Sequence, residues 1–334
     1  MNDKVIHLPQ TDATGLSENW LFKHCGEMHW DYLCAAMGVS GVNSKEMRDD
    51  AGNRLYPTFL AIRGRYATPL CKVQMDQHFQ TTVELNHFGR AFFHSTVAFR
   101  NGEARFDLEL LTTFVARYRK GLNDLHQSLP AANRVYNTTP LSSPPPLLKL
   151  SQKLRHAETT QYDFVGYHFS SSQNDLNLQI SFEPSPYIDY NGAGLLYFAA
   201  YPTIADTLER QLIIRHKLME GAGDWAVRTS TVARDVFYYR NLNLGQRLTA
   251  RLRRFDRMGE NIVLHTTLTA ESDGAALADS LVQHLYNKLA HLLRRLGDLG
   301  IGFKDLHSSE SSLEDIFVSL VHDAPTTRPR EARA

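Results

Sequence analysis

The first clear pattern in the chain is a run of apolar residues spaced three or four positions apart between residues 16 and 37. This spacing predicts one long helix with a single buried face. Ser17 is suited to cap its N-terminus, and Gly38 to end it. The apolar stripe contains Trp20, Leu21, Cys25, Met28 and Tyr32.

Runs rich in β-branched and aromatic residues follow the helix and predict an antiparallel meander. In the run at 91–100, Phe93, Val97 and Phe99 alternate with His94 and Thr96, which is typical of a strand with two different faces. Asn101-Gly102 predicts a two-residue hairpin turn, because both residues tolerate positive φ. The expected strands are 55–66, 73–85, 91–100 and 104–119.

The same order of elements occurs again after a proline-rich segment, TTPLSSPPP at 138–146, which predicts a linker. Strands at 162–169 and 176–182 are expected to precede a helix at 194–213. Strands at 227–239, 247–256 and 261–270 follow, then an accessory helix at 275–296. The polar tail, 324–334, is expected to be disordered.

Each half of the chain therefore predicts a long helix followed by several antiparallel strands. From the end of the helix to the glycine before a later strand, the spacing is 51 residues in one half (38 to 89) and 46 in the other (213 to 259). One helix wrapped by a curved antiparallel sheet is the hot-dog arrangement. We predict an α+β double hot dog in which the two sheets join and so cover a strand edge. The predicted parts are an N-terminal unit at 1–137, a linker at 138–157, a C-terminal unit at 158–323 and the tail at 324–334.

Composition and charge narrow the function classes. Hydrophobic residues make up 43% of the chain and charged residues 22%, as in globular proteins. Lys+Arg and Asp+Glu are both 36, which argues against a nucleic-acid partner. Three cysteines without a CxxC pair, and no long apolar segment, predict a cytoplasmic protein with no membrane partner.

Three segments of the first half carry a family resemblance: GLSENWLFKHCGEMHW (15–30), NRLYPTFLAIR (53–63) and ELLTTFVAR (109–117). They resemble the leinamycin-type bifunctional acyltransferase/decarboxylases of polyketide biosynthesis, the LnmK-like proteins. The resemblance implies that Tyr56 accepts a malonyl or methylmalonyl group from coenzyme A. It also implies decarboxylation of this group and transfer of acetyl or propionyl to an acyl carrier protein.

The expected chemistry suits a phenol. The pKa of a thiol is about 8.5 and that of a phenol is about 10, so an aryl ester resembles a thioester in acyl-transfer potential. Decarboxylation needs no metal or other cofactor, only donors at the oxygen where enolate charge develops. In a hot dog the amides at the start of the central helix supply such donors, which points to residues 15–20 and the Asn19 side chain. Thr112, Thr113 or Ser95 is expected to hydrogen-bond the carboxylate or the enolate, and Trp20 and His29 are predicted to contact substrate.

Alternative interpretations of these residues stay open. Tyr56 is also typical of a strand aromatic that packs into the core. Cys25 and His29 share a helix face, but two ligands are too few for zinc, so no metal site is predicted. His94 and His265 fall at related places in the two halves, which indicates a shared structural role.

A second enzymatic hypothesis rests on DYNGAGLLYF (189–198), which resembles the entrance of hot-dog thioesterases, where a carboxylate activates water. Asp189 and Asn191 are its candidate residues, although Asn191 with Gly192 can simply turn the chain and cap a helix. A non-catalytic acyl-carrier-binding protein is the third alternative. The expected partners are acyl-CoA and an acyl carrier protein, and the sequence leaves monomer and homodimer open.

Overall fold

The computed structural model describes residues 2–39, 46–102, 104–117, 123, 125–132, 134–159, 161–170, 176–219, 223 and 225–286. In the first half the long helix α1 spans Glu18–Ala36, and the Ser17 hydroxyl accepts a hydrogen bond from the backbone N–H of Trp20. This confirms the predicted helix and its cap. The strands of this half are β1 (Asn2–Val5), β4 (Leu55–Tyr66), β5 (His78–Phe88), β6 (Phe92–Asn101) and β7 (Ala104–Arg117).

The second half repeats this order. Its strands are β12 (Leu178–Phe182), β13 (Thr229–Tyr238), β14 (Leu248–Met258), β15 (Asn261–Ala270) and β16 (Ala276–Tyr286), and its long helix is α3 (Ala200–Arg215). Short elements complete the fold: β2 (Thr11–Asp12), β3 (Gly15–Leu16), β8 (Leu125–Gln127), β9 (Thr139–Pro140), α2 (Pro146–Arg155), β10 (Gln161–Phe164), β11 (Tyr167–Ser170) and α4 (Trp225–Arg228).

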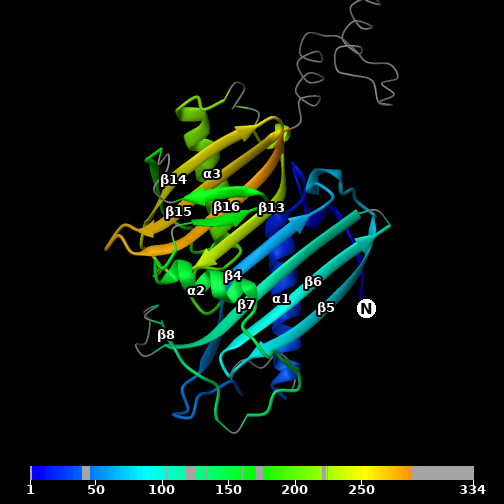
Figure 1. The fold of residues 1–334 in the computed structure, drawn as a ribbon, viewed down its shortest axis with the longest axis vertical. Helices are drawn as coiled ribbons and strands as arrows, with labels where there is room; N and C mark the ends of the chain where they lie inside the picture. Colours follow the sequence, from blue (N-terminus) through cyan, green and yellow to red (C-terminus); the bar gives the residue numbers. More distant parts are fainter. Residues whose placement is uncertain are drawn as a thin grey trace, which may run out of the picture. The chain divides into compact units, whose positions relative to one another are not determined.

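The two sheets join into one continuous sheet (Figure 1), because β4 pairs with β13, and it is antiparallel except where the short β9 pairs with β5. Read outward from this junction, the strands run β4-β7-β6-β5-β1 on one side and β13-β16-β15-β14-β12 on the other. The two halves are therefore related strand by strand. His94 and His265 occupy equivalent positions, and each places Nε2 3.1 Å from a carboxylate of the next strand, Glu109 or Asp279. The double hot-dog fold is confirmed.

Both faces of the sheet are covered. On one face a single core contains residues of both long helices, including Phe22 and Leu208, packed against strand residues such as Val236. On the other face α2 and the β10–β11 hairpin bury Leu147 and Phe164 against β4, β7 and β13. This double coverage explains why three consecutive residues of β4, Leu60, Ala61 and Ile62, are apolar and buried.

Four local predictions need correction. The helix expected at 275–296 is strand β16 over Ala276–Tyr286, because pairing with β13 and β15 overrides local helix propensity; residues 287–296 and the tail lie outside the described part. The predicted linker contains α2, with Pro146 in its first turn, where no amide donor is needed. The strand expected at 162–169 is a hairpin turning at Val165-Gly166, both with positive φ. Helix α3 begins at Ala200, not at residue 194.

The β6–β7 hairpin is confirmed with a small shift in register. Asn101 pairs with Ala104, so the turn begins one residue later than expected, at Gly102, whose φ is +51°. No helix in the described part of the chain is both long and apolar enough to cross a membrane.

Candidate active site

A cavity of about 990 Å³ lies beside the junction of β4 and β13. Strands β4 and β13 pair only from Ala61 to Arg65, against Phe237 to Ala233. On one side of this paired stretch, residues 56–60 of β4 and residues 238–241 line the cavity together. Its wall also includes residues from α1, α2 and β7, so both hot-dog units contribute to it.

Tyr56 and Thr113, two of the predicted site residues, line this cavity. The guanidinium carbons of Arg54 and Arg117 lie 4.8 and 5.5 Å from the centre of the Tyr56 ring, so two cations approach it. The Thr113 hydroxyl accepts a hydrogen bond from Gln127 Nε2 at 3.3 Å. Tyr56 is half-buried at a cavity wall, which distinguishes it from a sealed core aromatic.

A network of asparagines closes one side of the cavity. Asn123 Nδ2 donates to Asn241 Oδ1 at 3.0 Å and to the carbonyls of Gly194 and Leu242, and its backbone N–H donates to Asn243 Oδ1. Arg117 Nη2 donates to Asn123 Oδ1 at 2.8 Å. These residues belong to loops that are far apart in sequence. No periodicity or motif marks them, and the sequence analysis missed them.

The apolar part of the cavity is built around two aromatic rings in tilted contact. The ring centres of Phe59 and Phe198 lie 4.0 Å apart. Gly26 of α1 allows Phe198 to approach, because a Cβ at this position would lie 2.4 Å from the tip of the ring. This aromatic wall gives the cavity a region that suits an acyl chain.

Three other predicted residues form a separate buried cluster between α1 and the sheet. His29 Nδ1 lies 2.7 Å from Ser95 Oγ, and His29 Nε2 lies 2.9 Å from Thr112 Oγ1. One ring nitrogen donates and the other accepts, so the two hydroxyls satisfy both. Burial lowers the pKa of His29 to about 3, helped by the nearby His94. None of the three is among the cavity-lining residues of the described ranges, and their predicted roles with substrate stay predictions.

This cluster predicts a pH-dependent contribution to stability. The folded-state pKa of His29 lies below its ordinary value of 6.5. The stability that neutral His29 contributes is therefore fully present above about pH 6.5 and is lost as the pH falls toward 3. We expect the free energy of unfolding of the wild type to fall, relative to His29→Gln, by about 1.4 kcal/mol per pH unit in this window. Urea denaturation between pH 4 and 7 measures it. His168→Gln, an exposed histidine, is the control, and parallel curves for wild type and His29→Gln would contradict the prediction.

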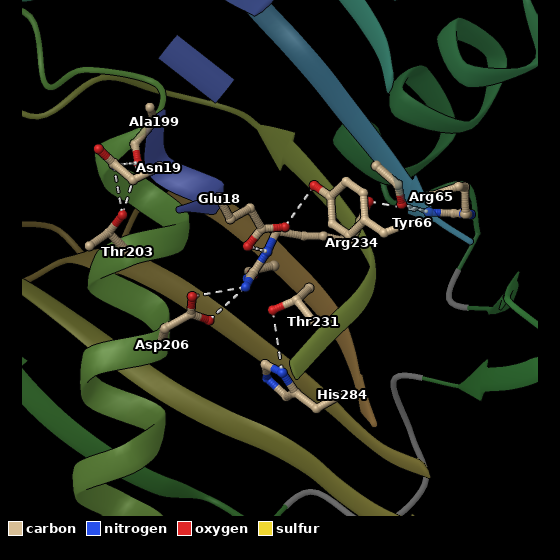
Figure 2. Close-up of polar contacts among 12 residues, drawn as sticks. Glu18, Asn19, Arg65, Tyr66, Ala199, Thr203, Asp206, Thr231, Arg234 and His284 are labelled. Atoms are coloured by element: carbon tan, nitrogen blue, oxygen red, sulfur yellow. Dashed lines mark hydrogen bonds and ion pairs between the residues drawn. The ribbon is translucent and has the colours of Figure 1, made fainter. Parts of the chain in front are cut away.

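Asn19 and Trp20 lie at the start of α1. Asn19 Nδ2 donates to the Ala199 carbonyl and to Thr203 Oγ1, both at 2.8 Å, which ties α1 to α3 (Figure 2). Trp20 stacks on His24 with ring centres 5.0 Å apart. The cavity contacts α1 at Gly26 and beyond, about 9 Å further along the helix axis at 1.5 Å per residue. The structure therefore does not bring these two residues to Tyr56, and the catalytic and binding roles predicted for them stay predictions.

The two predicted residues of the loop before α3, Asp189 and Asn191, have different surroundings. Asn191 lines the cavity, and its Oδ1 accepts the backbone N–H groups of Ala193 and Leu195 at 3.0 and 3.1 Å. It therefore shapes a turn, as the simpler interpretation expected. The Asp189 carboxylate is buried and accepts the Ser185 N–H at 2.7 Å, and burial raises its pKa.

Among the described residues that line the cavity, Glu27 is the one with an acidic side chain, and it was not predicted from the sequence. It lies on α1 next to Gly26, with 74% of its side chain exposed, 3.8 Å from His24 Nδ1. A charged residue on a helix surface normally indicates only a solvated face, so no sequence signal could have identified it.

Several solved structures with this architecture are described as acyl-thioesterases. A structure described as an oleoyl thioesterase from Lactobacillus plantarum matches with a TM-score of 0.59 at 11% identity, over 86% of this chain and 95% of that one. The 12:0-ACP thioesterase from Umbellularia californica has a TM-score of 0.53 at 9% identity, over 86% and 96%. An acyl-ACP thioesterase from Bacteroides thetaiotaomicron has 0.50 at 12%, over 85% and 96%.

At this level of identity the likeness establishes the fold, a double hot dog shared with acyl-thioester enzymes. The sequence matches no family model and no curated protein. Membership of the leinamycin-type family therefore stays a prediction.

Proposed function

We propose that this chain is an acyl-thioesterase that hydrolyses an acyl group from coenzyme A or from a carrier protein. The observation that carries the proposal is the cavity at the junction of the two hot-dog units, which combines an aromatic wall with convergent polar groups. The double hot-dog fold shared with solved acyl-thioesterases supports it.

The cavity contains groups suited to bind the acyl chain and the phosphate of a thioester substrate. The acyl chain packs against Phe59 and Phe198. Arg54, Arg155 and Arg240 place positive charge along the lining, where the phosphate of a pantetheine arm would bind. These groups come from the residue before β4, from α2 and from the loop after β13, so the binding site needs both halves of the chain.

Hydrolysis requires a base that takes a proton from the attacking water. Glu27 supplies a carboxylate at the cavity wall, and Asp189 is the carboxylate that the sequence motif selected. Glu27→Gln is expected to remove the base without changing the size of the side chain. Asp31→Asn, one turn further along α1, is the matched control, and Asp189→Asn tests the alternative carboxylate.

A second candidate is the acyltransferase/decarboxylase reaction on a malonyl or methylmalonyl group. It is favoured by the position of Tyr56 at the cavity wall with two guanidinium groups at its ring. In this reaction the phenol oxygen bonds to the acyl carbonyl carbon as the coenzyme A thiol leaves. Loss of carbon dioxide follows, and a carrier thiol then takes the shortened acyl group.

Product analysis separates these reactions. The protein is incubated with straight-chain acyl-CoAs and with malonyl- and methylmalonyl-CoA, with and without a phosphopantetheinylated carrier protein. We expect free acid and coenzyme A from the hydrolytic reaction. Carbon dioxide with acetyl- or propionyl-carrier would instead establish the second candidate. Carrier binding without cleavage of any thioester would contradict both and leave the non-catalytic alternative.

A further inference from the structure

A second cluster of chemically active side chains lies outside the cavity, between α3 and the sheet of the second half. Asp206 and Glu209 are three residues apart on one face of α3, and His284 comes from β16. One ligand atom from each of the three lies within 4.8 Å of the other two. Figure 2 shows Asp206 in contact with Arg234, and His284 in contact with Thr231.

The cluster contains buried polar atoms that lack partners among the described residues. These atoms are both carboxylate oxygens of Glu209, Nε2 of His284 and Oγ1 of Thr266. Glu209 is 1% exposed, His284 is 5% exposed, and Thr266 is fully buried. Native proteins satisfy nearly all such groups, because each unpaired one costs about 1–3 kcal/mol. The Thr266 hydroxyl can donate to one Glu209 oxygen, so at least the second oxygen and His284 Nε2 remain without a partner, which indicates a ligand.

The charges around the cluster indicate a divalent cation. Arg234 is bound by Glu18 and by Asp206, and Glu209 adds a third carboxylate. Three carboxylates and one guanidinium sum to −2, which one divalent ion would neutralise. A carboxylate keeps lone pairs after accepting hydrogen bonds, so Asp206 can bind an ion while it holds Arg234.

The neutral imidazole of His284 suits a metal ligand as well. Burial and the nearby Arg234 lower the pKa of His284 to about 3, so the ring is neutral. Its Nδ1 lies 3.4 Å from the Thr231 hydroxyl, which orients the ring, and its Nε2 has no partner among the described residues. Metal-binding histidines use one nitrogen for the ion and hold the other in this way.

We propose that Asp206, Glu209 and His284 bind one divalent transition-metal ion of the zinc class. One nitrogen and two carboxylate oxygens suit such an ion. Bonds of about 2.0–2.2 Å at tetrahedral angles place ligand atoms about 3.3–3.6 Å apart, so binding would draw together three ligand atoms that now lie within 4.8 Å of one another. The ion would fasten α3 to β16 and remain separate from the thioester cavity.

A proton is the competitor of the ion. Burial, together with Asp206, raises the pKa of Glu209 to about 8, while Arg234 and the nearby Thr266 hydroxyl act in the opposite direction. Metal ligands bind in their deprotonated form, so binding is expected to release a proton and the affinity to rise with pH.

The test is titration of the metal-stripped full-length protein with Co²⁺, followed by its visible absorption and by calorimetry. We expect one equivalent to bind with release of a proton, and Zn²⁺ to displace it. Glu209→Gln and His284→Gln should weaken binding by about 100-fold or more. His265→Gln, the same change on the neighbouring strand β15, should bind Co²⁺ like the wild type.

The wild-type titration decides the proposal even where a variant folds poorly. Absence of a saturable equivalent in the wild type would overturn it, and the orphaned atoms would then belong to a buried water or a proton. Equal binding by the wild type, Glu209→Gln and His284→Gln would also overturn it. Neither result bears on thioester cleavage, because the readout is metal binding.

Discussion

Replacing Arg234 by leucine is expected to lower the free energy of unfolding by about 3–5 kcal/mol, the usual cost of removing one partner from a buried ion pair. Arg234 is fully buried. Its Nε donates to Glu18 Oε2 at 2.8 Å, and its Nη2 donates to both Asp206 oxygens at 2.8 and 2.9 Å. Glu18 belongs to the first hot-dog unit and Asp206 to the second, so the substitution leaves charge unpaired at their junction.

Urea denaturation at pH 7 with a chelator present measures this change without any contribution from bound metal. Arg247→Leu is the control, because Arg247 is half-exposed and its contacts with Glu183 and Glu271 are 3.4 and 3.3 Å long. An exposed pair of this kind contributes at most about 1 kcal/mol. A loss of less than 1 kcal/mol for Arg234→Leu would show that the buried cluster is not important for stability.

Replacing Tyr56 by phenylalanine is expected to lower kcat/KM for thioester cleavage by about 10²-fold or more, the usual contribution of a positioned proton-transfer group. Three other cavity tyrosines, Tyr201, Tyr238 and Tyr239, donate their hydroxyls to groups of the protein. Tyr56 makes no such bond within the described residues, so its hydroxyl is available to substrate, either as nucleophile or as hydrogen-bond donor to the thioester carbonyl.

Steady-state assays on the acyl-CoA that is cleaved fastest test this expectation, and Tyr187→Phe at an exposed position serves as the control. Intact-protein mass spectrometry then distinguishes the two roles. An acyl adduct on the wild type that Tyr56→Phe lacks identifies a nucleophile, as in the transferase reaction. A slower reaction without an adduct indicates a donor in direct hydrolysis. Unchanged kinetics in Tyr56→Phe would remove Tyr56 from the mechanism.

The fold could be predicted where local signals agree with the final pairing. Helix α1 and the hairpin after Asn101 follow from apolar spacing, a serine cap and a glycine turn, which act over a few residues. Strand β16 was predicted as a helix, since its strand conformation depends on β13 and β15 on its two sides. Distant partners override weak local propensity at such positions.

The candidate site was less predictable for the same reason. Tyr56 and Thr113 were chosen from segments of the first half, and both line the cavity. The asparagines that close its side come from loops more than 100 residues apart. The proposed metal ligands Asp206 and His284 are likewise far apart in sequence, which explains why spacing rules predicted no metal site.

The amino-acid sequence alone determined the two-fold repeat of a helix and an antiparallel meander, because apolar periodicity and turn residues act locally. Only the tertiary structure decided where the two repeats open to form a cavity and which charges become buried together. Both depend on the β4–β13 junction, where residues of separate halves come into contact and lose water. Loss of water is what makes a carboxylate, an imidazole or a phenol chemically unusual, and no stretch of sequence contains that information.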